Sequence, residues 1–181
     1  MSRGPEDLSS AAPAQRREPP LKPLELMAAL RRHQVDFVVI GGFSLAAHGY
    51  VRGTKDLDIV PEPGRPNLGR LMDALEELQA EPLALGDFRP EEVLPLGLEN
   101  LELGGNWLLR TRFGRLDVMQ YVEGLKNYAR LRAGAVEIEL SELPDPPPFA
   151  GYDDLIAMKR AAGREEDLRD IAQLERVRGG G

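Results

Sequence analysis

Three acidic residues stand in apolar stretches, where a carboxylate is costly unless it has a partner. Asp56 and Asp58 are separated by one leucine at the start of an apolar run, and Asp117 has an apolar residue on each side. Residues two apart in a strand point to the same face, so Asp56 and Asp58 should project together. Two such carboxylates repel unless a cation lies between them, and their oxygens suit Mg²⁺ or Mn²⁺. If the strand of Asp117 pairs beside theirs, the three acids converge as in two-metal phosphoryl or nucleotidyl transfer.

A glycine pair precedes the acids and suggests a phosphate site. The apolar run 35–40 leads into Gly41 and Gly42, and Ser44 follows. Glycines allow a phosphate to approach the backbone, and the N–H groups of a helix start, together with the Ser44 hydroxyl, would bind it. We therefore expect Ser44 to cap a short helix over 45–48. The pattern matches neither a Walker A loop nor a dinucleotide-binding loop, so by itself it does not specify the ligand.

Each feature also has an ordinary structural explanation. A glycine pair after a strand commonly forms a tight turn. The acid pair could form ion pairs with Arg52 or Lys55, and Asp117 could bind Arg110 or Arg112 across a hairpin. The order and spacing of the features together favour the phosphate and metal interpretation.

The stretch GGFSLAAHGYVRGTKDLD, from Gly41 to Asp58, followed by the later Asp117, resembles the DNA polymerase β-like nucleotidyltransferase superfamily. Thirteen residues separate Gly42 from Asp56, within the range of that family. The stretch is similar in particular to the small bacterial branch. That branch contains minimal nucleotidyltransferases and the nucleotidyltransferase toxins of abortive-infection toxin–antitoxin systems. The resemblance covers roughly 35–178, although its specific motifs are short.

The resemblance implies a reaction in which an NMP moves from an NTP such as ATP to a hydroxyl acceptor while pyrophosphate leaves. Asp56 and Asp58 would hold Mg²⁺ (or Mn²⁺) on the triphosphate, and Asp117 would hold a second ion and help to deprotonate the hydroxyl. The residues expected to bind the nucleotide in this block are Gly41, Gly42, Ser44, Arg52 and Thr54. The catalytic work would be mainly positioning and charge neutralisation.

The acceptor and partners implied by the resemblance are less specific. The acceptor could be RNA such as tRNA, a protein side chain or a small molecule, and the toxin-like branch implies an antitoxin or other partner protein. An alternative is a catalytically degenerate nucleotide-binding or protein-interaction module with the same fold.

A second motif lies near the C-terminal end, over 159–171. It resembles the Lys…Arg…Asp-x-x-Asp helix of the toxin-like branch, which implies that Lys159 and Arg164 lie near the nucleotide phosphates. Helical spacing would place Lys159, Asp167 and Asp170 along one face, but the roles of the two acids stay open. The alternative is a solvated, ion-paired helix surface.

The elements that must position these residues follow from apolar periodicity and turn residues. Asn67 is expected to cap an amphipathic helix that continues to Leu78, and the segment 81–105 should contain loops and one short strand. The other expected elements are a helix over 23–33, strands over 35–40, 56–60 and 135–140, a hairpin of 107–112 with 115–121, and helices over 152–162 and 164–177 joined near Gly163.

This pattern predicts an α/β (α+β) fold with a mixed sheet and helices packed on it. We expect a disordered tail over 1–20, a catalytic domain over 21–143, and a helical segment over 144–178 packed on that domain.

Composition excludes several other kinds of site. The 181 residues include no cysteine, which excludes disulfides, zinc–thiolate sites and cysteine nucleophiles. The sequence has two histidines, which argues against a histidine-rich metal site. No apolar run is long enough to span a membrane, no secretory signal is evident, and we expect a cytoplasmic protein. The formal net charge of −7 disfavours a role in coating DNA or RNA.

Overall fold

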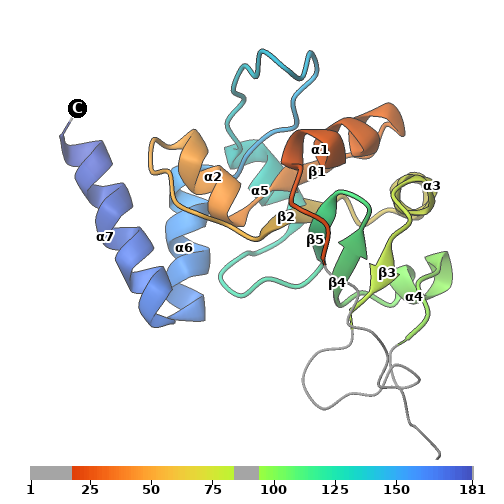
Figure 1. Ribbon diagram of the computed structural model, residues 1–181. Helices are drawn as coiled ribbons and strands as arrows, with labels where there is room; N and C mark the ends of the chain where they lie inside the picture. Colours follow the sequence, from red (N-terminus) through yellow and green to blue (C-terminus); the bar gives the residue numbers. More distant parts are fainter. Residues whose placement is uncertain (1–17, 84–93, 181) are drawn as a thin grey trace, which may run out of the picture.

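The computed structural model describes residues 18–83 and 94–180, which form a five-stranded mixed sheet with helices on both faces (Figure 1). The strands lie in the spatial order β1-β2-β5-β4-β3. Strands β2 and β5 are parallel, and the other neighbouring strands are antiparallel. The strands are β1 (Phe37–Val39), β2 (Asp56–Pro61), β3 (Glu81–Pro82), β4 (Asn106–Thr111) and β5 (Gly114–Met119). The helices are α1 (Pro23–Arg32), α2 (Gly41–Ala47), α3 (Arg65–Glu77), α4 (Leu98–Glu102), α5 (Tyr128–Gly134), α6 (Tyr152–Ala162) and α7 (Glu165–Gly179).

Alternation along β2 places a hydrophobic core on each face of the sheet. Leu57 and Ile59 belong to a core shared with α1 and α3. Val60 belongs to a second core shared with α5, α6 and α7. Because successive side chains of a strand point to opposite faces, Asp56 and Asp58 lie on the face of the second core. The acids therefore face the side of the sheet on which α6 and α7 pack (Figure 1).

The helices α6 and α7 form an antiparallel hairpin whose turn is Gly163. This glycine has φ +62°, the left-handed conformation with which many helices end, and α7 begins directly after Arg164. Apolar residues of both helices lie in the second core. The two helices and the joint near Gly163 agree with the sequence prediction.

Two helix starts differ from the prediction. Helix α2 begins at Gly41, with Ile40 as its cap, so Ser44 lies inside the helix and does not cap it. Helix α3 begins at Arg65, where the proline at its second position is well suited to a first turn. Asn67 is buried in that turn, and its side chain binds the backbone of Asp36 instead of capping the helix.

The segments between the strands were predicted less completely. Strand β3 is the short strand expected in 81–105, but α4 and α5 were not predicted. The expected strand over 135–140 forms only isolated bridges, such as Val136 with Phe149. The predicted tail lies outside the described residues over 1–17, as does part of the 81–105 segment, over 84–93. Among the helices of the described residues, none has the length and apolar character needed to cross a membrane.

Candidate active site

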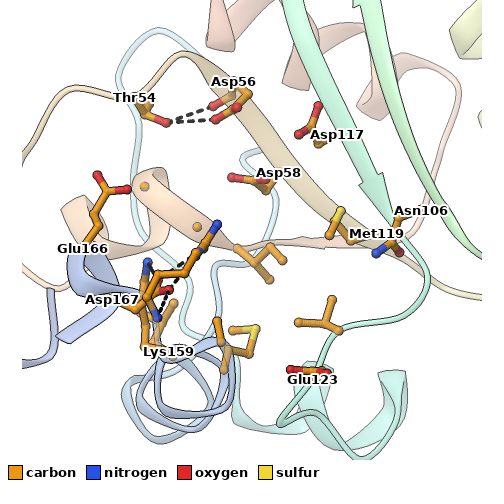
Figure 2. Close-up of a pocket in the computed structure, with 18 of the residues that line it drawn as sticks. Thr54, Asp56, Asp58, Asn106, Asp117, Met119, Glu123, Lys159, Glu166 and Asp167 are labelled. Carbon is orange, nitrogen blue, oxygen red and sulfur yellow. Dashed lines mark hydrogen bonds and ion pairs between the residues drawn. The ribbon is translucent and has the colours of Figure 1, made fainter. Parts of the chain in front are cut away.

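The pairing of β2 with β5 brings the three predicted acids together. Asp58 lies directly opposite Asp117 in this parallel pair, and Asp56 lies opposite Arg115. All three acids line one cavity of about 860 Å³ between the sheet and the α6–α7 hairpin (Figure 2). This volume is within the range of small-molecule sites.

The half-buried Asp58 and the buried Asp117 lie too close together for their charges to be balanced by the groups around them. Asp117 is only 6% exposed, and its Oδ1 has no hydrogen-bond partner within the described residues. Burial, followed by the charge of Asp58, raises the pKa of Asp117 to about 7. Burial, followed by the charge of Asp56, raises the pKa of Asp58 to about 6. A cation between the acids would relieve both effects.

Arg115 is a member of the cluster to which sequence reasoning gave no role. Its Nη2 lies 3.7 Å from Asp117 Oδ2 and 3.9 Å from Asp56 Oδ2, too far for a closed hydrogen bond. The candidates that the sequence suggested pair elsewhere, Arg110 with Glu81 and Arg112 with a glutamate of α3. The missed signal is the two-residue spacing of Arg115 and Asp117, which places both on one face of β5.

Gly41 and Gly42 allow the start of α2 to lie against the acid-bearing strand. Gly41 has φ +65°, and a Cβ there would lie 2.1 Å from Asp58 Oδ2. A Cβ at Gly42 would lie 2.9 Å from the side chain of Thr54. Both glycines line the cavity, so the close approach that the sequence suggested for a phosphate also serves the packing of Asp58.

Ser44 is not positioned as predicted. Its side chain is fully buried, and its hydroxyl donates to the Val39 carbonyl at 2.6 Å. The same oxygen accepts a hydrogen bond from the Ala150 backbone N–H at 3.2 Å. Because α2 begins four residues earlier than expected, the hydroxyl points into the protein, and the expectation that it binds phosphate is wrong.

Lys159 and Arg52 are held by buried carboxylates at the C-terminal hairpin. The Lys159 ammonium lies 2.8 Å from Asp167 Oδ1 and 2.7 Å from Asp170 Oδ2. The Arg52 guanidinium donates to both oxygens of Asp170, at 3.0 and 3.1 Å. These ion pairs connect the α6–α7 hairpin to the loop that precedes β2. The prediction that Lys159, Asp167 and Asp170 share one face of a helix is wrong, because the helix ends at Gly163. These residues meet across the hairpin instead.

Arg164 and Thr54 also line the cavity, and both are more exposed than Lys159. The Arg164 side chain is 72% exposed and donates to Asp167 Oδ2 at 2.7 Å. Burial acts to raise the pKa of Asp167, but hydrogen bonds from Arg164 and Lys159 hold it below its ordinary value. The Thr54 hydroxyl lies 3.2 Å from Asp56 Oδ1 and donates to it, which orients that carboxylate (Figure 2).

The donor set fits a hard divalent cation that shares its ligands with a substrate. Within the described part of the chain, no three acidic, histidine or cysteine side chains stand close enough to hold a metal by themselves. Mg²⁺ commonly takes one or two carboxylates and completes its shell with phosphate oxygens and water. The free Oδ1 of Asp117 and the raised pKa values of Asp58 and Asp117 agree with such a site.

Comparison with solved structures identifies the fold. The solution structure of the antibiotic-resistance factor ANT(2'')-Ia matches with a TM-score of 0.50 and 14% identity, over 86% of this chain and 86% of that chain. The crystal structure of ANT(2'')-Ia in complex with adenylyl-2''-tobramycin matches with a TM-score of 0.50 and 13% identity, over 86% of this chain and 91% of that chain. ANT(2'')-Ia is an aminoglycoside nucleotidyltransferase of the polymerase β-like superfamily.

The chain has a nucleotidyltransferase-like fold. The predicted fold class is therefore confirmed. No protein-family model matches the chain, and no curated protein matches it in sequence. At 14% identity the similarity concerns the fold, so residue roles must be argued from the cavity itself.

Proposed function

We propose that this protein is a metal-dependent nucleotidyltransferase that moves an NMP from an NTP to a hydroxyl group. The observation that carries the proposal is the parallel register of β2 and β5. That register sets Asp58 opposite Asp117, beside Asp56, at one open cavity. Among the residues that the structure describes, none bonds to the Oδ1 of the buried Asp117, which supports the proposal because a buried acceptor without a donor is costly unless a ligand completes it.

The residues divide into three roles under this proposal. Asp56 and Asp58 would hold Mg²⁺ or Mn²⁺, and Asp117 is the third carboxylate available to a cation. A bound divalent ion would supply charge neutralisation at the triphosphate. The backbone of Gly41 and Gly42, the Thr54 hydroxyl and the exposed Arg164 guanidinium bind phosphate oxygens. Lys159 and Arg52 hold the α6–α7 hairpin in place through Asp167 and Asp170.

Asp117 also has the properties of a general base. The acceptor oxygen attacks the α-phosphorus, and the bond between that phosphorus and the α–β bridging oxygen breaks. The leaving pyrophosphate takes the electron pair, and the hydroxyl proton passes to the Asp117 carboxylate. The cation held by Asp56 and Asp58 would keep the neighbouring Asp117 carboxylate ionised, as a proton acceptor must be.

The charges around the cavity favour a small-molecule acceptor over tRNA. The rim carries both signs, with the exposed acids Glu123 and Glu166 beside the exposed bases Lys55 and Arg164. A tRNA site would need a mainly basic groove. ANT(2'')-Ia was crystallised with an adenylylated form of tobramycin, a small hydroxyl-bearing molecule, which supports the same class. No observation supports the toxin role or an antitoxin partner, and we do not propose them.

Transfer of labelled nucleotide tests this proposal. The protein would be incubated with Mg²⁺ and each α-³²P-labelled NTP. The acceptors would be a panel of aminoglycosides and other polyhydroxyl compounds, bulk tRNA, and the protein itself. We expect a labelled small-molecule adduct with wild type and with Asp153→Asn, which changes an exposed acid of α6. We expect none with Asp117→Asn.

Two results would contradict the proposal. If Asp117→Asn transfers as much label as wild type, Asp117 takes no part in the chemistry. Mg²⁺-dependent NTP binding without transfer to any acceptor would favour the degenerate nucleotide-binding module instead.

A further inference from the structure

The cavity has a second half that the proposed chemistry does not use. Beyond the acids, the lining on the side of Met119 is mainly apolar, with Asn106 and Glu123 as its polar members (Figure 2). Its apolar residues are Leu108, Met119, Tyr121, Val122, Leu155 and Met158. An apolar surface beside a phosphate and metal site favours an apolar part of the ligand, because contact between the two removes both surfaces from water.

Along β5 and the residues after it, the side chains that line the cavity change from charged to apolar. Asp117 and Met119 of β5 line the cavity, and Tyr121 lines it just after the strand ends. Each step of two residues along a strand covers about 6.6 Å. A rigid molecule with its phosphates at Asp117 could therefore lie along this face toward Tyr121.

Tyr121 is an exposed ring on a fixed backbone. Tyr121 is 67% exposed, although it lines the cavity. The Asn106 Nδ2 donates to the Tyr121 carbonyl at 2.9 Å, and the Tyr121 N–H donates to Asn106 Oδ1 at 3.0 Å. These two bonds fix the position from which the ring projects, so a ligand that stacks on it loses little entropy in ordering the loop.

The helix side supplies the opposite wall. Met158 of α6 is 7% exposed and Leu155 is almost fully buried, yet both line the cavity. Methionine side chains on the two walls, Met119 and Met158, are polarizable and adapt to flat rings. Figure 2 shows Met119 and Asn106 on the side of the cavity away from Asp167 and Glu166.

We propose that this apolar half binds the nucleobase of the donor NTP, with the base stacked against Tyr121 and enclosed by Met119 and Met158. This inference rests on the proposed function and adds the nucleobase subsite to it. The base is joined through one ribose to the phosphate at which Asp58 and Asp117 act, so it must lie within a short reach of them.

The same arrangement predicts that the base is recognised by its ring and not by its edge. The side-chain nitrogen and oxygen of Asn106 both bind the Tyr121 backbone, so this amide already serves to hold the loop. Stacking tolerates any base, because every base has a π-face. We therefore expect all four NTPs to bind, with the larger purines somewhat tighter.

Equilibrium binding with Mg²⁺ tests the subsite. The ligands would be the four NTPs and inorganic tripolyphosphate, which has the phosphates and no base. Tyr121→Ala should weaken each NTP by about tenfold and leave tripolyphosphate unchanged, and Tyr121→Phe should stay within about twofold of wild type. Leu103→Ala, at another exposed apolar residue that does not line the cavity, is the control and should change neither.

The other outcomes separate the two proposals. If wild type binds tripolyphosphate and NTPs equally, or if Tyr121→Ala binds NTPs like wild type, the base subsite is wrong while the phosphate site stands. Equal weakening of NTPs and tripolyphosphate by Tyr121→Ala would also overturn it. If wild type binds neither ligand, the proposed function itself fails.

Discussion

At the scale of single residues, the site is defined by carboxylates that the fold holds together against their own repulsion. The half-buried Asp58 and the buried Asp117 lie on adjacent strands, and their pKa values are raised to about 6 for Asp58 and about 7 for Asp117. Arg115 offsets part of the charge, but its guanidinium does not close a hydrogen bond with either neighbouring acid. Such clusters of perturbed carboxylates in a cavity are typical of functional sites.

The raised pKa values predict that the protein without divalent cations loses stability as pH rises. A carboxyl whose folded-state pKa is above its unfolded value stabilises the fold while it is protonated. The contribution of Asp58 and Asp117 is therefore fully present below about pH 4 and is lost as pH passes 6 and 7. Urea unfolding at a series of pH values in EDTA, across pH 5 to 8, would measure the loss.

Two comparisons make the pH experiment specific to the acids. Asp58→Asn should flatten the decline and raise the unfolding free energy at pH 8 by about 1 kcal/mol, because it removes one repelling charge. Addition of Mg²⁺ should reduce the pH-dependent loss of unfolding free energy in wild type and not in Asp58→Asn. A decline that is identical in Asp58→Asn and wild type would show that other groups cause it.

At the scale of elements, the α6–α7 hairpin is held to the rest of the chain by buried charge. Lys159 and Arg52 share Asp170, and Lys159 and Arg164 share Asp167. A buried charge whose partner is removed is strongly destabilising. The position of this cavity wall therefore depends on these ion pairs as well as on the apolar contacts of the second core.

Replacement of Lys159 distinguishes a positioning role from direct phosphate binding. Lys159→Met keeps the apolar stem and leaves the buried acids short of one cation, so we expect a loss of about 3 kcal/mol in unfolding free energy. Arg160→Met, at the neighbouring exposed position, should change it by less than about 0.5 kcal/mol. Unchanged stability together with a large loss of NTP affinity would instead make Lys159 a phosphate ligand, as the sequence predicted.

The sequence predicted elements well where apolar periodicity was strong and less well where tertiary contacts decide the structure. The strands of the three acids, the hairpin around Phe113 and the terminal helix pair follow from local pattern. The start of α2 does not, because Gly41 has a left-handed conformation and lies against Asp58, a tertiary contact that no local pattern shows. The same one-turn difference moved Ser44 from an expected cap to a buried position.

At the scale of the whole molecule, the sheet separates a structural face from a functional face. The core with α1 and α3 fills one face completely. The other face is filled only in part by the second core, and the remaining space is the cavity that the acids line. Residue types alone predicted the acids, but the cavity and its apolar half depend on where α6 packs, which no local pattern encodes.

The central claim is that this cavity binds a nucleoside triphosphate through a cation held by the acids. Thermal unfolding of wild type and of Asp56→Asn/Asp58→Asn, with each NTP and with or without Mg²⁺, tests it most directly. A ligand at 100 times its Kd stabilises the native state by about 2.7 kcal/mol, which is roughly 5–10 °C in Tm for a chain of this size. We predict such a shift for wild type with Mg²⁺ and an NTP, and its loss in the double variant. No shift with any NTP, or an equal shift in the double variant, would contradict the account.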